Sequence, residues 1–190
     1  MRTPVIVFAL LMPVFAEGQD VVVTAKAGLM QVLNESYDLV YGSTTPTVGA
    51  AARLELGRRW SLSLGADIGG KDGQQIIYTP EGPVPGDTPV DITLQTVILA
   101  VGVRAGPVVL SIGPALLRLQ EEGEFDQESI SAYGGHAAAR VERSFGSWLG
   151  GVELGYLLVP GVFEAGGAAA VEDETSFSAV TVSASVGYRF

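Results

Sequence analysis

The segment VTVSASVGYRF, residues 180–190, alternates strictly between two kinds of side chain. One set is wholly apolar and ends in two aromatic residues: Val180, Val182, Ala184, Val186, Tyr188 and Phe190. The other set is small or polar and contains one charge: Thr181, Ser183, Ser185, Gly187 and Arg189. Because successive side chains of a β-strand point to opposite faces, the segment predicts a strand with one apolar face and one small polar face.

The same alternation occurs in seven segments upstream. They cover residues 20–30, 47–57, 60–70, 90–104, 108–119, 130–145 and 148–158. Short turns are expected at 57–60, 104–108 and 143–148, whereas 71–89, 120–129 and 160–174 are interpreted as long loops. This alternation of short and long connections is typical of an up-and-down antiparallel sheet, with all short turns at one end. No segment shows helical periodicity, a domain linker or a solenoid repeat.

The composition limits the class of protein. Apolar residues make up 47% of the 190 residues and charged residues only 17%, against about 25% in an ordinary soluble domain. Mean hydropathy is +0.34, yet no central stretch reaches the roughly 18 consecutive apolar residues of a transmembrane helix. The net charge of −10 argues against a nucleic-acid partner, and the lack of Cys excludes disulfides and thiolate metal sites.

The first 16 residues, MRTPVIVFALLMPVFA, have the features of a secretory signal peptide. Arg2 supplies a positive charge, residues 5–15 form an apolar core, and residues 14–16 provide small or branched side chains at the cleavage site. We expect cleavage before Glu17 and a single β-barrel domain over residues 17–190. A membrane anchor is the alternative, but the apolar run is short for it.

Eight antiparallel strands can close into a barrel, which removes every unpaired edge. A soluble barrel needs an outer face rich in Lys, Glu and Thr, but here the polar face is mainly Gly, Ala and Ser. Those residues suit a narrow lumen, and Trp60 and Trp148 beside short turns suit an interfacial girdle. We therefore predict an all-β, eight-stranded antiparallel up-and-down transmembrane β-barrel. A soluble periplasmic barrel is the alternative.

Charged side chains occur sparsely on the predicted inner face. An eight-stranded barrel is just wide enough for side chains to fill, and buried charges require partners. We therefore expect a lumen charge network that plugs the barrel, with a narrow channel as the alternative; Arg118 is expected on the outer face, near its loop. The predicted network comprises Lys26, Arg53, Glu55, Asp67, Arg104, Arg140, Glu142, Glu153 and Arg189.

Residues 17–190 resemble small eight-stranded outer-membrane β-barrel proteins of the OmpA transmembrane-domain and OmpX type. The last strand resembles their assembly signal, an aromatic residue preceded by apolar residues at alternate positions: Val182, Ala184, Val186, Tyr188 and Phe190. The resemblance implies recognition by the barrel-assembly machinery, residence in the cell outer membrane, and contact with its lipids and lipopolysaccharide. It also implies periplasmic short turns and extracellular long loops. We expect a monomer with a structural or surface-interaction role, no enzymatic activity and no cofactor.

His136 is the only histidine, so histidine-dependent catalysis would have to use it. A membrane-embedded lipid-modifying enzyme resembling lipid A deacylases is the alternative function. That pattern has Ser two residues after the His, where this chain has Ala138, which leaves Ser111 or Ser131 as candidate partners. A lone histidine facing a lumen is more often part of a polar network.

Most acidic residues fall in the predicted loops, with EEGEFDQE (121–128) as the densest run. The run lacks the ligand spacing of an EF-hand, so we expect a solvated acidic rim and no metal site. Divalent cations that bridge this rim to lipopolysaccharide phosphates are a hypothesis at this stage.

Overall fold

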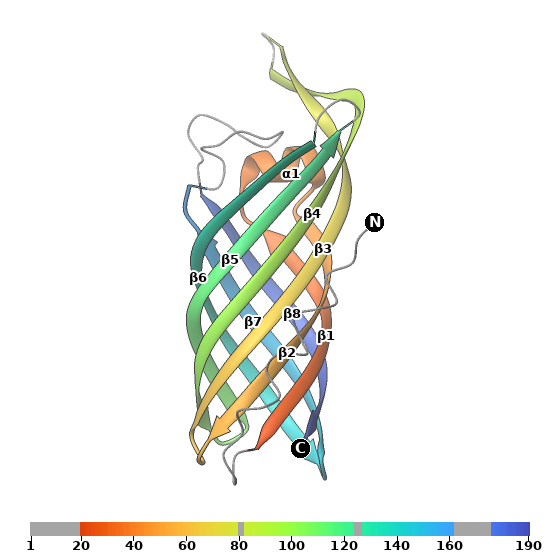
Figure 1. The fold of residues 1–190 in the computed structure, drawn as a ribbon. Helices are drawn as coiled ribbons and strands as arrows, with labels where there is room; N and C mark the ends of the chain where they lie inside the picture. Colours follow the sequence, from red (N-terminus) through yellow and green to blue (C-terminus); the bar gives the residue numbers. More distant parts are fainter. Residues whose placement is uncertain (1–19, 80–81, 124–126, 162–175) are drawn as a thin grey trace.

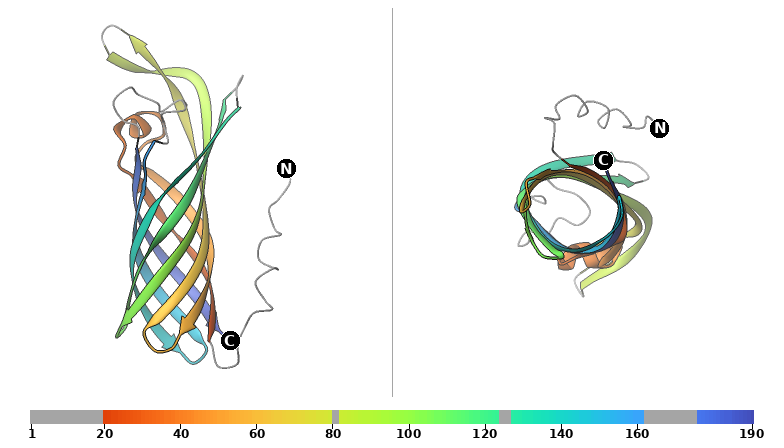
Figure 2. Two further views of the ribbon diagram at one scale, coloured as in Figure 1. Left: turned by 60° about the vertical axis from the view of Figure 1, so that its left-hand side comes forward. Right: turned by 90° about the horizontal axis from the view of Figure 1, so that it is seen from below.

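The computed structural model describes residues 20–79, 82–123, 127–161 and 176–190. They form a closed barrel in which consecutive strands pair antiparallel and β1 pairs with β8 (Figures 1 and 2), so the predicted fold is confirmed. The elements are β1 (Val21–Val32), α1 (Glu35–Tyr41), β2 (Thr44–Leu56), β3 (Trp60–Thr79), β4 (Gly82–Ala105), β5 (Val108–Gly123), β6 (Gln127–Phe145), β7 (Trp148–Val159) and β8 (Phe177–Arg189). The predicted signal peptide, residues 1–16, lies outside the described residues.

The C-terminal strand closes the barrel as its alternation predicts. β8 pairs on one side with β1, where Val182 is opposite Leu29, and on the other side with β7. Val182 and Val186 on the outer face are 52% and 53% exposed, whereas Ser183 on the inner face is buried. The polar set of this strand therefore faces the lumen and the apolar set faces outward.

Three tight turns join β2 to β3, β4 to β5 and β6 to β7 at one end, which we call the short-turn end. Each turn contains a glycine with positive φ, 70° at Gly57, 62° at Gly106 and 68° at Gly146. A side chain is strained in this backbone conformation, so glycine is the residue that permits these turns. The other end, the long-loop end, carries α1 and the extended β3–β4 hairpin (Figure 1).

The expectation of loops at 71–89 and 120–129 is wrong for most of these residues. β3 and β4 continue as a paired hairpin to Thr79 and Gly82, and β5 and β6 remain paired to Glu122 and Gln127. Prolines 83, 85 and 89 are tolerated in β4 because its pairing with β5 begins only at Val90. Before that point β3 is the strand that β4 pairs with in the described part of the chain, and proline is tolerated at a strand edge without a partner.

The helix α1 was not predicted. Asn34 caps its N-terminus by accepting a 2.8 Å hydrogen bond from the backbone N–H of Tyr37, and Gly42, with φ of 71°, ends it. Seven residues are too few to show helical periodicity, which explains why the sequence pattern missed it. Within the described residues, no helix is long and apolar enough to cross a membrane.

The barrel interior has two layers of different chemistry. Charged side chains lie in the half near the short turns, and an apolar core lies in the half near the long loops. β4 shows the change, because Ile92 and Leu94 point inward and are at most 2% exposed. The core consists of Met30, Val32, Tyr37, Val40, Tyr41, Val90, Ile92, Leu94, Ile98, Ala100, Ala115, Leu117, Leu119, Leu157, Val159, Phe177 and Ala179.

Candidate functional site in the barrel lumen

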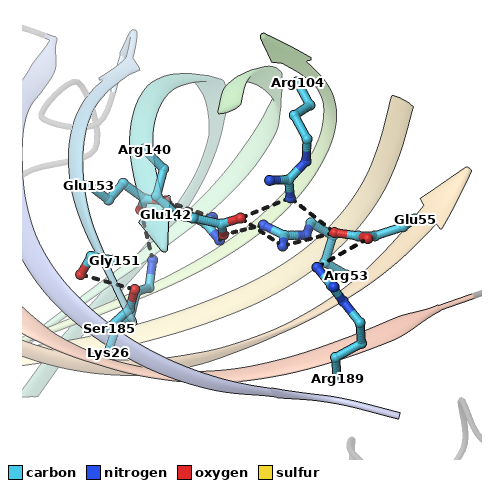
Figure 3. A network of polar contacts seen from close by, with 10 residues as sticks. All are labelled: Lys26, Arg53, Glu55, Arg104, Arg140, Glu142, Gly151, Glu153, Ser185 and Arg189. Carbon is cyan, nitrogen blue, oxygen red and sulfur yellow. Dashed lines mark hydrogen bonds and ion pairs between the residues drawn. The ribbon is translucent and has the colours of Figure 1, made fainter. Parts of the chain in front are cut away.

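Glu142 is the centre of the lumen charges (Figure 3). Its carboxylate accepts hydrogen bonds from Arg53 of β2 and, at 2.9 Å, from Arg104 of β4. Arg140, two residues earlier on the same face of β6, also donates a bond, of 3.2 Å. Arg53 and Glu142 are 3% and 6% exposed, so their charges are compensated almost entirely by each other and by these neighbours.

Glu153 forms a second centre on β7, directly opposite Arg140 in the β6–β7 pairing. The Arg140 guanidinium contacts it with nitrogen–oxygen distances of 2.8 and 2.7 Å. Lys26 of β1 lies 3.5 Å from Glu153 and 2.9 Å from Asp67 of β3. Arg140 thereby links the two centres along the barrel wall, because it bonds Glu142 on its own strand and Glu153 on the adjacent strand.

Gly49 makes the contact between Lys26 and Asp67 possible. It lies in β2 between the two, opposite Lys26 on one side and opposite Asp67 on the other. A Cβ at this position would lie 1.9 Å from the Asp67 Oδ1 atom, so only glycine leaves space for the carboxylate. The small residues of the inner face therefore give room to the charged ones.

The mouth of the short-turn end is built around Glu55. Its carboxylate lies 3.1 Å from Arg53, 3.0 Å from Arg104 and 3.5 Å from Arg189. Asp20, a residue that the sequence reasoning did not include, lies 3.9 Å from Arg189. Asp20 immediately precedes the first strand, and its place beside Arg189 follows from closure of β8 against β1. All nine residues of the predicted network thus lie in one connected set of ion pairs.

His136 lies on the long-loop side of this network, beside a small cavity. The residue is buried, and its Nδ1 atom has no hydrogen-bond partner among the described residues. The cavity has a volume of about 30 Å³ and is also lined by Lys26, Asp67 and Thr96. This volume suffices for one or two water molecules and not for a lipid acyl chain.

The two serines proposed as partners of His136 are not brought to its Nδ1 atom. Ser131 is exposed, whereas His136 is buried on the inner face. Ser111 is paired with Ala138, one step along the inner face from His136. Among the described residues, no group of three or more His, Cys, Asp or Glu is placed to hold a metal ion.

α1 contributes polar contacts that sequence reasoning missed. The Tyr41 hydroxyl donates a 2.7 Å hydrogen bond to buried Glu121, and the Tyr37 hydroxyl lies 2.9 Å from the Thr45 hydroxyl. Burial and the neighbouring Glu121 carboxylate raise the pKa of Tyr41 far above its ordinary value, and burial raises the pKa of Tyr37. Both side chains therefore stay protonated when α1 is docked.

Solved structures of other barrels superpose on most of the chain. The Yersinia pestis attachment invasion locus protein Ail, in complex with the heparin analogue sucrose octasulfate, matches with TM-score 0.56 and 14% identity. The alignment covers 92% of this chain and 100% of Ail. Neisserial surface protein A matches with TM-score 0.57 and 13% identity over 92% of this chain and 100% of that one. The chain has the fold of small eight-stranded outer-membrane β-barrels.

A major outer membrane protein from Thermus thermophilus shares this fold, with TM-score 0.52 and 15% identity over 91% of this chain and 100% of that one. No protein-family model and no curated protein matches the sequence. At these identities the likeness concerns the fold, and the function has to be argued from the residues of this barrel.

Proposed function

We propose that the chain is an integral outer-membrane protein with a closed lumen and a structural or surface-interaction role. The observation that carries this proposal is the outward apolar band. On β4, Val97, Leu99 and Val101 are 44–49% exposed on the outer face. Burying such a surface in lipid is favourable, whereas water would leave it exposed on every side of the barrel.

Polar and aromatic residues mark the limits of this band. Trp60, Phe145 and Trp148 are exposed at the short-turn end, where aromatic side chains suit a membrane interface. Towards the long loops the outer face becomes polar, and Arg118 is exposed there and bonds Ser129 at 3.2 Å. A charge is tolerated at that depth because its cost falls towards zero at the interface.

The sidedness and the assembly of the barrel are part of the same proposal. We propose that the short turns face the periplasm, that the long-loop end faces outward among lipopolysaccharide, and that the protein is a monomer. The terminal strand, with Val182, Val186, Tyr188 and Phe190 on its outer face, supports recognition by the barrel-assembly machinery. Export by a signal peptide completes the proposal.

The two interior layers support a lumen plugged at two levels in series. The ion pairs around Glu142 and Glu153 occupy the half of the lumen near the short-turn end, and the apolar core with α1 occupies the half near the long-loop end. The lumen cavity beside His136 is small, about 30 Å³. A continuous water path for ions would have to cross both layers, so we favour a closed barrel over a channel.

The segments at the long-loop end are strongly acidic. They contain 15 of the 21 acidic residues of the chain but only two basic ones, Lys71 and Arg118, and they cover residues 33–43, 71–91, 118–128 and 159–176. The negative charge of the long-loop end would repel a polysulfate of the kind bound by Ail. We propose instead that divalent cations bridge these carboxylates to lipopolysaccharide phosphates. Calcium titration should tighten association with lipopolysaccharide, and an unchanged affinity would contradict this part.

The experiment for the whole proposal is heat-modifiable gel migration of the outer-membrane fraction. The folded barrel should migrate differently from the boiled chain and should require detergent for release. A protein that fractionates without detergent and shows no shift would contradict the proposal. The enzymatic rival has a separate test, in which overexpression changes the mass of lipid A and His136→Ala abolishes that change.

A further inference from the structure

Three exposed arginines surround the short-turn end. Arg58 and Arg59 lie in the β2–β3 turn, and Arg143 lies on β6 near the β6–β7 turn. No described carboxylate forms an ion pair with any of the three. The carboxylates described nearby, Asp20 and Glu55, already pair with lumen arginines. The turn with Arg58 and Arg59 is four strands away from the turn beside Arg143 around the closed barrel, so the two sites lie on opposite sides of this end.

Arg143 is held in a geometry suited to an anion. Its guanidinium carbon lies over the ring of Phe145, 5.5 Å from the ring centroid. A guanidinium that rests on an aromatic ring in this way keeps in-plane N–H groups available, and these match the oxygens of a phosphate bidentately. Phe145 is itself 61% exposed and is paired with Trp148, so the site lies within the aromatic girdle.

The position of Arg143 among exposed aromatic residues indicates the kind of partner it binds. Exposed Trp60 directly follows Arg59, and exposed Trp148 is paired with Phe145, whose ring lies under Arg143. Aromatic girdles mark the depth of lipid headgroups, so the Arg143 guanidinium, which rests on the exposed ring of Phe145, lies at the level of lipid phosphates. An uncompensated positive charge at this depth is attracted to a negatively charged leaflet more than to a zwitterionic one.

We propose that Arg143 binds the phosphate group of an anionic phospholipid in the leaflet at the short-turn end, with Arg58 and Arg59 adding positive charge on the opposite side of the same end. This inference rests on the proposed membrane insertion. The partner chemistry is a phosphodiester with net negative charge, such as phosphatidylglycerol.

The two tryptophans of the chain provide the readout, since both lie at this end. The folded protein is placed in vesicles of phosphatidylcholine and phosphatidylglycerol, with bromine on the acyl chains of one lipid at a time. Trp60→Phe isolates the fluorescence of Trp148. Brominated phosphatidylglycerol should quench Trp148 more strongly than its mole fraction in the vesicle predicts. The association constant of phosphatidylglycerol for the site should be about fivefold higher than that of phosphatidylcholine.

Arg143→Gln should bring that ratio close to one. Arg118→Gln is the matched control, because Arg118 is also exposed on the outer wall but lies at the other end, bonded to Ser129. The control should keep the wild-type ratio. Heat-modifiable migration of each variant verifies that it is folded.

The outcomes separate this inference from the proposed function. Quenching by both lipids in proportion to their mole fractions would overturn the lipid site while leaving membrane insertion intact. Equal loss of preference in Arg143→Gln and Arg118→Gln would also overturn it, because net charge alone would then explain the effect. If neither brominated lipid quenches a folded protein, the proposed membrane location itself fails.

Discussion

Glu142 is the residue on which three lumen arginines converge, so its charge should matter more than that of any exposed carboxylate. Glu142→Gln leaves Arg53, which is 3% exposed, without its main counter-charge. Removing one partner of a buried ion pair costs about 3–5 kcal/mol. We expect a loss of this order in the free energy of unfolding by urea, followed by circular dichroism in vesicles. Glu122→Gln, at an exposed position, should change it by less than about 0.5 kcal/mol.

Gly49 tests whether the small residues of the inner face are required. In Gly49→Ala, the new Cβ would lie 1.9 Å from Asp67 Oδ1 and 2.5 Å from a backbone oxygen of β3, so the Lys26–Asp67 ion pair has to shift. Overpacking of this kind costs about 1–3 kcal/mol in unfolding free energy. Gly65→Ala is the matched control, because its Cβ would meet nothing closer than 3.5 Å. Equal stability of the two variants would contradict the steric argument.

The inner-face residues were predictable one by one, because the period of two assigns each to a face. Their partners were not. Arg53 and Glu142 belong to β2 and β6, which are not neighbours in the sheet, so their contact depends on closure and stagger of the whole barrel. Asp20 was missed for the same reason, since its neighbour Arg189 comes from the opposite end of the chain.

At the scale of elements, the strands were predicted well near the short turns and poorly near the long loops. The alternation of β4 reverses along its length, from apolar outward at Val97–Val103 to apolar inward at Val90–Leu94. The apolar residues therefore change from one face of the strand to the other partway along it. Such a change does not indicate one continuous strand in the sequence. The prolines of residues 82–89 and the polar residues Asp91, Thr93 and Gln95 then favour a loop, although β3 supplies a pairing partner.

α1 should depend on the hydrogen bond between Tyr41 and Glu121. Tyr41→Phe removes one hydrogen bond from a buried carboxylate, at a cost of about 1–3 kcal/mol. We expect faster chymotrypsin cleavage within residues 35–41 of the folded protein. Asp38→Asn, in the same helix at an exposed position, should cleave at the wild-type rate. If Tyr41→Phe is as resistant as wild type, the bond does not hold the helix.

The docking of α1 should also weaken at alkaline pH. Tyr41 has a folded-state pKa raised above the ordinary value of 10.0, so its contribution to docking is complete below pH 10 and declines as pH rises further. Absorbance at 295 nm should therefore show that Tyr37 and Tyr41 ionise only when the protein unfolds. The Tyr41→Phe variant should lose one of these late ionisations. Ionisation of all tyrosines near pH 10 in the folded protein would contradict burial of Tyr37 and Tyr41.

At the scale of the whole molecule, the order of the two interior layers determines what breaking the ion pairs can do. If the charges around Glu142 were the sole barrier, Glu142→Gln would open a path for ions. The apolar core and α1 lie in series with these charges, so the folded variant should remain as closed as wild type. Planar bilayers containing either protein should show no stepwise current. Steps in Glu142→Gln alone would make the ionic layer the gate, and steps in wild type would favour the channel function.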